Sequence, residues 1–183
     1  MRILILDGNP DAQDADLETY LHGLETELKG KGHEVQRQIL RDMDIRYCTG
    51  CWGCWVKTPG KCVFPDESYD VCRAYLHADF VLMASPVVMG FTSALLKKTQ
   101  DRLIPLLHPY FDFVQGETHH HARYEAYPSL GLLLKRSPET DGEDLEIITD
   151  MFSRFALNFK TELVFSGELD QEVREIADAL DRL

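Results

Sequence analysis

Five short runs of strand character alternate along the chain with longer segments in which apolar residues recur every three or four positions. The runs are typical of strands and cover residues 2–7, 34–40, 79–84, 130–134 and 161–165. The periodic segments are typical of amphipathic helices and cover residues 12–29, 66–77, 92–107, 142–159 and 170–183. Strands that alternate with helices form right-handed βαβ units. The pattern predicts an α/β protein with a five-stranded parallel sheet and leaves several strand orders open.

An open parallel sheet binds its ligand outside the carboxyl ends of its strands, where the strand order reverses. Three loops of this chain can reach that place, namely residues 8–16, 85–91 and 135–141. We therefore expect these loops to form the functional site, whichever strand order holds. A chain of 183 residues fits one domain, so residues 1–183 are expected to form a single unit around this sheet.

Residues 41–65 show neither a helical nor a strand period, and they contain four of the five cysteines and both tryptophans. A loop of this length inside a compact domain is usually functional or disordered, and its aromatic content disfavours disorder. The four cysteines are Cys48, Cys51, Cys54 and Cys62. Three thiols at two-residue spacing, with a fourth from the same segment, can face a common centre, as an iron–sulfur cluster requires.

Two other interpretations of this Cys/Trp-rich loop stay open. A zinc site more typically uses two separated Cys-x-x-Cys pairs. The cysteines can also be small buried hydrophobic residues under the two tryptophans, with no metal. The fifth cysteine, Cys72, falls within an expected helix and is assigned to the core.

The net charge of −12 argues against partners that are held by their phosphates. Nucleic acids and anionic membrane surfaces both attract basic patches, whereas acidic residues outnumber basic ones here by 31 to 19. No apolar run approaches the roughly 18 residues of a membrane helix, and the first residues do not read as a signal peptide. We expect a cytoplasmic protein, in which clustered thiols bind metal, carry out redox chemistry or stay free.

Residues 108–126 are expected to be irregular. Their three consecutive histidines, His119 to His121, suggest either a metal-binding tract or a solvated loop, and the second is favoured because no acidic or cysteine partner has ligand-like spacing nearby. Tyr110, Phe111 and Phe113 are more apolar than an exposed loop should be. Exposed apolar patches mark interaction sites, so a homodimer that covers these side chains is predicted.

Residues 85–97 read Ser-Pro-Val-Val-Met-Gly-Phe-Thr-Ser-Ala-Leu-Leu-Lys, and Asp101-Arg102 follow. This segment resembles the Ser-Pro-Val-Tyr loop and the following helix of the NAD(P)H-dependent FMN reductases, and the resemblance runs from the first strand to the last helix. It implies a flavodoxin-like three-layer αβα sandwich with sheet order 2-1-3-4-5, FMN as cofactor and NAD(P)H as co-substrate. Val88 replaces the tyrosine of the family loop.

The same resemblance implies that residues 85–91 form a flavin platform. Backbone groups from Pro86 to Gly90 would face the edge of the isoalloxazine ring, Phe91 would pack on its face, and Lys135 or Arg136 would lie near its pyrimidine edge. The flavin-contacting residues implied in this loop are Ser85, Pro86, Val87, Val88, Met89, Gly90 and Phe91. The alternative is an ordinary turn between a strand and a helix, punctuated by Pro and Gly.

A second segment, Cys48-Thr49-Gly50-Cys51-Trp52-Gly53-Cys54 followed by Gly60-Lys61-Cys62 and Asp66, is similar to the compact cysteine motif of the iron-sulfur flavoproteins. These proteins are a branch of the same family. The similarity implies that the four cysteines hold a cubane cluster beside FMN.

The first loop departs from the family pattern, which usually reads Gly-Ser-Pro-Arg and continues to a hydroxyl residue at the start of the helix. There the hydroxyls and backbone N–H groups bind the FMN phosphate. Here Gly8 and Asn9 open the loop, Asp11 replaces the arginine and Asp16 stands at the hydroxyl position, with Asp14 between them. Two like charges ~5 Å apart repel by roughly 3 kcal/mol at an effective dielectric of about 20. The sequence therefore predicts weak FMN binding, through Gly8, Asn9 and Asp16 if the phosphate binds there.

Three functions are consistent with these features. The leading one is an FMN-dependent NAD(P)H oxidoreductase that passes electrons to a small acceptor such as a quinone, a flavin or another carrier, with the flavin itself doing the chemistry. The second is an iron–sulfur flavoprotein that carries single electrons through the cysteine loop. The third is a flavin-free binding module that has kept the fold and lost the phosphate site.

Overall fold

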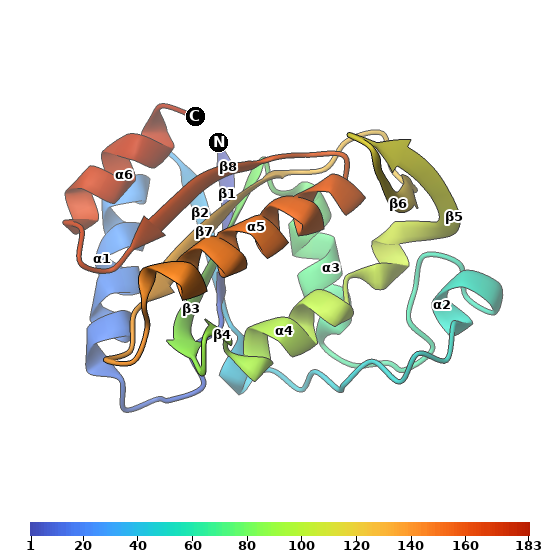
Figure 1. The fold of residues 1–183 in the computed structure, drawn as a ribbon, viewed down its shortest axis with the longest axis horizontal. Helices are drawn as coiled ribbons and strands as arrows, with labels where there is room; N and C mark the ends of the chain where they lie inside the picture. The colour runs from blue at the N-terminus through green and yellow to red at the C-terminus, as the bar shows by residue number, and fades with distance from the viewer.

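The computed structural model describes residues 1–183 and has a twisted parallel sheet at its centre (Figure 1). The sheet order is β2-β1-β3-β7-β8, and all four neighbouring pairs are parallel. Its strands are β1 (Arg2–Asp7), β2 (Glu34–Ile39), β3 (Phe80–Val88), β7 (Ser129–Lys135) and β8 (Leu163–Glu168). Counted along this sheet the order is 2-1-3-4-5, so the predicted flavodoxin-like topology is confirmed.

Helices cover both faces of the sheet and complete three layers (Figure 1). One face packs against α1 (Ala15–Gly30) and α6 (Val173–Asp181). The other face packs against α3 (Ser68–His77), α4 (Ala94–Asp101) and α5 (Gly142–Asn158). Successive side chains of a strand point to opposite faces, so alternate residues of the continuous apolar strands supply each of the two cores.

Helices α1, α4 and α5 each begin at a residue whose side chain caps the helix. Asp14 caps α1 by accepting a hydrogen bond from the N–H of Leu17, and Ser93 caps α4 in the same way through Leu96. Caps of this kind satisfy N–H groups that have no partner within the helix. Helix α1 then buries four leucines, one turn apart, against the sheet: Leu17, Leu21, Leu24 and Leu28. The expected helix over 92–107 is shorter, because α4 ends before Pro105 and a 3₁₀ turn, η2 (Ile104–Leu106), follows.

The expectation that residues 108–126 are irregular is wrong. They contain most of a β-hairpin made of β5 (Leu107–Val114) and β6 (Glu117–Ala122), which stands apart from the main sheet. Gln115 and Gly116 join the strands, and both have φ near the left-handed region, at 52° and 84°. Two-residue turns with positive φ at both positions suit the twist of antiparallel strands. As a turn signal, the dipeptide Gln-Gly is weaker than Asn-Gly. The prolines and histidines in the flanking strands also obscure the alternation of apolar and polar residues that is typical of a strand.

Strand β3 also extends further than its sequence predicted. It continues through Ser85 and Pro86 to Val88, turns at Met89 and Gly90, and pairs antiparallel with β4 (Phe91–Thr92). The Cys/Trp-rich loop begins within the 3₁₀ turn η1 (Leu40–Asp42) and contains one short helix, α2 (Gly53–Val56). No helix is both long and apolar enough to cross a bilayer.

Candidate functional site

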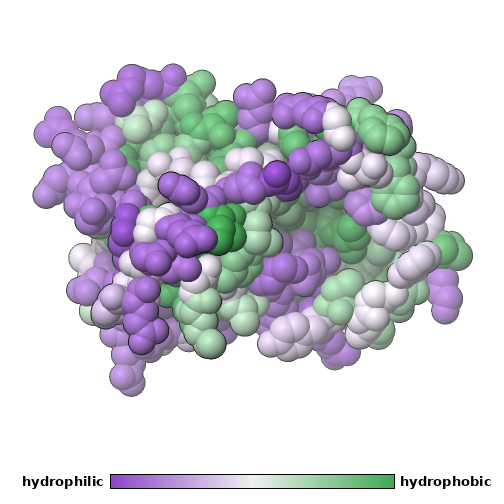
Figure 2. Space-filling view, viewed as in Figure 1, coloured by the Kyte–Doolittle hydropathy of each residue, from purple (hydrophilic) through white to green (hydrophobic).

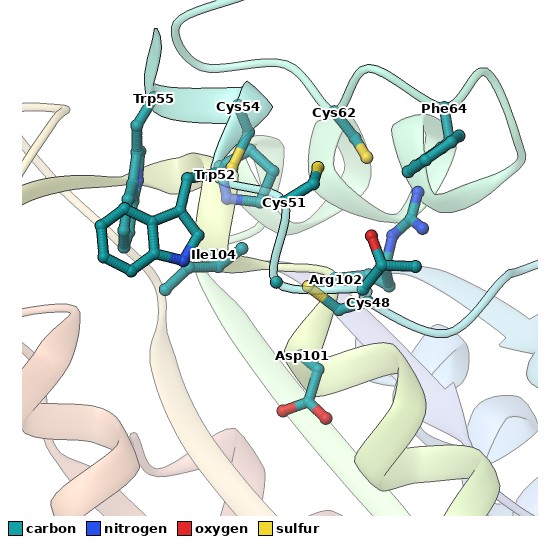
Figure 3. A pocket seen from close by; sticks show the side chains of 13 residues that line it. Cys48, Cys51, Trp52, Cys54, Trp55, Cys62, Phe64, Asp101, Arg102 and Ile104 are labelled. Atoms are coloured by element: carbon teal, nitrogen blue, oxygen red, sulfur yellow. The ribbon is translucent and has the colours of Figure 1, made fainter.

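The four cysteines of the Cys/Trp-rich loop surround one small pocket of about 120 Å³, which we call the cysteine pocket (Figure 3). Cys54 is buried, Cys62 is half-buried, and Cys48 and Cys51 are exposed at the rim. Apart from the cysteines, most of the wall is apolar and comes from the same loop and from the residues after α4, including Trp52, Trp55, Phe64, Ile104 and Pro105. The structure thus brings together the four residues that the sequence grouped by spacing.

Tight turns explain why this loop curls around the pocket. Gly50 and Trp52 both have positive φ, at 63° and 59°, so the chain reverses direction around Cys51. Gly53 opens α2 in close contact with Val63, whose Cγ1 would lie 2.5 Å from a Cβ added at this glycine. The N–H of Gly60 then donates to the carbonyl of Cys54 at 3.0 Å and returns the chain toward Cys62.

Polar contacts hold the loop against the rest of the protein. The indole N–H of Trp55 donates to the carbonyl of Leu107 at 3.0 Å, and the hydroxyl of Tyr69 donates to the carbonyl of Cys62 at 2.5 Å. Asp66, at the end of the loop, pairs with Arg102 beside the pocket at 2.9 Å. Sequence reasoning missed this ion pair, because nothing in the spacing of two residues 36 positions apart indicates contact.

The thiols differ in character according to their surroundings. Burial raises the pKa of Cys54, and the neighbouring Cys62, Cys48 and Cys51 raise it further. The N–H of Gly53 lowers the pKa of the exposed Cys51. Burial raises the pKa of Cys72 to about 12, and its thiol donates to the carbonyl of Arg102 outside the pocket. Cys72 is therefore a packing residue, as its sequence position suggested.

The donor set of the cysteine pocket fits a cluster better than a single ion. No group of three or more His, Cys, Asp or Glu side chains is arranged so that it could hold one metal ion. Four cysteines around a common space are nevertheless the ligand set of a cubane, whose several irons are each bound by one thiolate. The apolar wall also supplies the low-dielectric shell that tunes such centres.

An aromatic stack joins the cysteine loop to the hairpin. Trp52 lies edge-on to Trp55, Trp55 packs on His120 of β6 with ring centroids 5.3 Å apart, and His120 packs on Phe111 of β5 at 5.0 Å. The imidazole of His120 contacts the carbonyl of His108 at 2.9 Å through Nδ1. The expectation of a solvated histidine loop is therefore wrong for His119, which is buried, and for His120, which is stacked; of the three histidines, only His121 is exposed.

A wider hollow of about 560 Å³ adjoins the cysteine pocket and shares Cys48 and Gly50 with it. It lies between the hairpin, α4 and the end of α5, and Figure 2 shows this face hollowed beside α5 with apolar side chains inside. Its wall combines aromatic rings with hydrogen-bonding groups, namely Phe111, Phe155, Phe159, Gln100, Asn158 and His120.

The predicted flavin platform forms the β3–β4 hairpin at the carboxyl edge of the sheet, at the lower edge of Figure 1. Val88 and Met89 are exposed there, and Phe91 is half-buried against the core. The hydroxyl of Ser85 accepts the N–H of Ser93 at 2.9 Å and donates to the carbonyl of Pro86, so it holds the turn together. An exposed hairpin at this edge suits the ring of a flavin, which this fold class holds at its switch point.

The loop from Gly8 to Asp14 is packed tightly under this hairpin. A Cβ added at Gly8 would lie 2.9 Å from the carbonyl oxygen of Ala84 and 2.8 Å from Leu96. Asn9 is buried, and its Nδ2 has no hydrogen-bond partner in the chain. Asp14, rather than Asp16, occupies the cap of α1, while the side chain of Asp16 is 89% exposed.

Lys135 and Arg136, one of which the resemblance places near the pyrimidine edge of the flavin ring, are both engaged in ion pairs. Lys135 Nζ lies 2.5 Å from Asp14 Oδ1 and 3.6 Å from Asp16 Oδ2, and Arg136 pairs with Glu168. Burial by itself lowers the pKa of Lys135, but the contact with Asp14 outweighs burial and leaves that pKa raised. The β3–β4 hairpin thus fits the ring of a flavin. The loop from Gly8 to Asp16, where the flavin phosphate would lie, is acidic and its cation Lys135 is already paired, so it does not fit a dianion.

Comparison with known proteins agrees with this geometry. Residues 1–124 match the model of the family described as NADPH-dependent FMN reductase. The chain therefore belongs to the NADPH-dependent FMN reductase family, as the segment from Ser85 to Arg102 predicted. An azoreductase from Bacillus anthracis shares the fold over the whole of both chains, with a TM-score of 0.70 and 13% identity. An FMN-dependent NADH-azoreductase from Bacillus anthracis, solved with FMN, aligns over all of this chain and 95% of its own, with a TM-score of 0.63 and 10% identity.

Curated relatives with closer sequences are named iron-sulfur flavoproteins. One from Archaeoglobus fulgidus is 37% identical over 82 residues, which are 45% of this chain and 36% of the relative. Another from Methanocaldococcus jannaschii is 36% identical over 76 residues, which are 42% of this chain and 38% of the relative. The chain therefore spans well under half the length of both relatives.

Proposed function

We propose that this chain is an NAD(P)H-dependent flavin oxidoreductase whose Cys/Trp-rich loop holds a [4Fe–4S] cluster and passes electrons to a small acceptor. The observation that carries the proposal is the convergence of four cysteines on one apolar pocket of a flavodoxin-like fold. Membership of the FMN reductase family and the names of the iron-sulfur flavoprotein relatives support it.

Cys48, Cys51, Cys54 and Cys62 are the proposed ligands of the cluster. A bound cluster supplies one-electron chemistry. The protein's part is to hold four thiolates around one space, to shield them with Trp52, Trp55 and Phe64, and to fix the loop through Asp66. Zinc is disfavoured because a zinc site more typically uses two separated Cys-x-x-Cys pairs than the compact spacing of these four cysteines.

The overall reaction oxidises NAD(P)H to NAD(P)⁺ and reduces the acceptor by two electrons and two protons, one of which comes from solvent. A flavin supplies the hydride chemistry in such enzymes, so the protein needs a platform and an open face rather than a catalytic triad. The β3–β4 hairpin is the proposed platform, with Ser85 and Ser93 fixing its shape from below and Val88 and Met89 facing outward.

The acceptor is proposed to bind in the 560 Å³ hollow beside Cys48. A volume in the range of small-molecule pockets, roughly 300–1,000 Å³, with aromatic walls and a few amide and imidazole groups, suits a flat carbonyl compound such as a quinone. There it would lie next to the cysteine pocket, because the two spaces share a wall at Cys48 and Gly50.

We further propose that two copies of the chain associate through the hairpin. Tyr110, Phe111 and Phe113 are 68%, 65% and 85% exposed, although large aromatic side chains on one strand are normally covered. A two-fold interface would let the same strand cover its counterpart.

Metal analysis tests the cluster directly. Protein reconstituted anaerobically with iron and sulfide should hold about four irons per chain, the content of a cubane, and show a broad brown absorption. Cys51→Ala should lose most of that iron. Iron below one per chain in the wild type would contradict the cluster.

Cys72→Ala is the matched control, because Cys72 lies outside the cysteine pocket and bonds to the carbonyl of Arg102. This variant should keep the wild-type iron content. Equal losses from Cys51→Ala and Cys72→Ala would show that the ligand assignment is wrong, even if a cluster forms.

A further inference from the structure

The loop between β1 and α1 uses its own acceptors to satisfy the N–H groups that an anion would need. In open α/β sheets a phosphate usually binds at the start of the helix that follows the first strand, through N–H groups that are free there. Here side-chain oxygens of Asp7, Asn9, Asp11 and Asp14 accept the N–H groups of four residues along the loop, namely Asn9, Asp11, Gln13 and Leu17, at 2.9–3.3 Å.

Backbone carbonyls take further N–H groups of the same turn. The N–H of Asp14 donates to the carbonyl of Asp11 at 3.2 Å, and the N–H of Ala15 donates to the carbonyl of Gln13 at 2.8 Å. A phosphate that entered would have to displace these acceptors, among them the carboxylate of Asp14 that caps α1.

The charge at this place also opposes a phosphate. Asp11, Asp14 and Asp16 bring three negative charges and Lys135 brings one positive charge, so the net charge is −2. Lys135 is the cation nearest the cap, and it is held between Asp14 and Asp16. Arg37 and Arg41 lie on the other side of the loop, where they pair with the buried Asp7 and with Glu18.

The same groups suit a neutral chain of hydroxyl groups. Asp11 and Asp16 are exposed, and their carboxylates can accept hydrogen bonds from hydroxyls. Asn9 is 1% exposed, and its Nδ2 has no partner in the chain, so it is a donor left for an oxygen of the ligand, whether that oxygen is charged or not. Buried donors of this kind are costly unless they are satisfied.

We propose that the β1–α1 loop selects a flavin without a terminal phosphate, so that this chain binds the riboflavin form at least as tightly as FMN. The inference rests on the proposed function, because it concerns the flavin of the same site. Selectivity comes from Asp14, which occupies the cap and engages Lys135, and from the carboxylates of Asp11 and Asp16, which add negative charge that the single cation Lys135 does not balance.

The test is a titration of the flavin-free full-length protein with riboflavin and with FMN, followed by the fluorescence of the flavin. Riboflavin should bind with a Kd equal to or below that of FMN. Added salt should tighten FMN binding and leave riboflavin unchanged, because salt screens like-charge repulsion. FMN binding that is tighter than riboflavin binding would overturn the inference while supporting the proposed function, and binding of neither flavin would overturn both.

Asp14→Ser is the decisive variant, because serine still caps a helix but removes the charge and releases Lys135. It should tighten FMN binding about tenfold, the gain typical of a hydrogen bond to a charged group, and change riboflavin binding less than about twofold. Asp178→Asn is the matched control, since Asp178 pairs with Lys31 at 2.5 Å, away from the loop on α6. A ratio of FMN to riboflavin affinity that is the same in Asp14→Ser and Asp178→Asn would overturn the inference.

Discussion

Asp66 and Arg102 form a buried ion pair, with Oδ1 and a guanidinium nitrogen 2.9 Å apart and side chains only 0% and 2% exposed. The pair joins the end of the Cys/Trp-rich loop to the residue that follows α4. Asp66 also accepts the N–H of Arg46 and the hydroxyl of Ser68, so one carboxylate anchors both ends of the loop. The shape of the cysteine pocket therefore depends on a residue that is not a ligand.

Asp66→Asn should destabilise the protein by about 3 kcal/mol, because it leaves Arg102 buried and unpaired. Urea unfolding near neutral pH measures this loss. Asp70→Asn, which breaks the exposed pair with Arg73, is the control and should cost less than about 0.5 kcal/mol. Similar losses from both variants would show that the buried pair has no special role.

The effect of Asp66 also has a defined pH dependence. Burial raises the pKa of Asp66, but the hydrogen bonds from Ser68 and Arg46 and the charge of Arg102 outweigh it and lower the pKa below its ordinary 3.8. A lowered pKa in the folded state adds stability above the ordinary pKa, and this stability disappears as the pH falls through the folded value. The difference between wild type and Asp66→Asn should shrink as the pH falls below 3.8, and a constant difference would contradict the assignment.

Met89 and Gly90, at the tip of the β3–β4 hairpin, both have positive φ, at 51° and 75°. A non-glycine residue costs about 1–2 kcal/mol in this left-handed region of backbone conformation. Met89 is 96% exposed, so the packing of its side chain offsets little of this cost. Met89→Gly should stabilise the flavin-free protein by about 0.5–1 kcal/mol, after the entropy cost of glycine. If the hairpin is the flavin platform, the same variant should weaken flavin binding. Lower stability of Met89→Gly would show that Met89 packs on the protein.

Gly90→Val should destabilise the protein by roughly 2 kcal/mol, through positive φ and through contact with Asp144, whose Oδ1 would lie 2.7 Å from the new Cβ. Gly116→Val, in the other hairpin, has φ of 84° with no atom within 4 Å, and isolates the backbone contribution. Thermal melts of both variants measure the difference. Gly90 is thus a backbone requirement first, and loss of flavin binding in Gly90→Val alone would not locate the ring.

The parallel sheet and the helices that cover it could be predicted from the sequence, because the central strands are continuous apolar runs and each main helix has one apolar face, and both patterns are visible within the segment itself. Leu17, Leu21, Leu24 and Leu28 mark the buried face of α1, and the four clustered cysteines mark their pocket by spacing alone. The ion pairs of Lys135 with Asp14 and of Asp66 with Arg102 could not be predicted, because they join residues 121 and 36 positions apart. The hairpin was missed because His119 is buried and His120 packs on Trp55 and Phe111, and a local sequence pattern does not contain these contacts.

Phe113→Lys should shift the protein from dimer to monomer in light scattering, since it places a charge in the proposed interface. Tyr47→Lys is the control, because Tyr47 is 71% exposed in the Cys/Trp-rich loop rather than on the hairpin. A wild-type monomer, or a Phe113→Lys dimer as stable as the wild type, would contradict an interface at this strand.

The most direct test of the central claim is the visible spectrum of the flavin-loaded protein during anaerobic addition of NADPH or NADH. An NAD(P)H-dependent flavin oxidoreductase should lose the yellow flavin absorption within the experiment, and a quinone added afterwards should restore it. The reduced nicotinamide should be consumed in proportion to the quinone. A yellow absorption that neither nucleotide changes would contradict the proposed function.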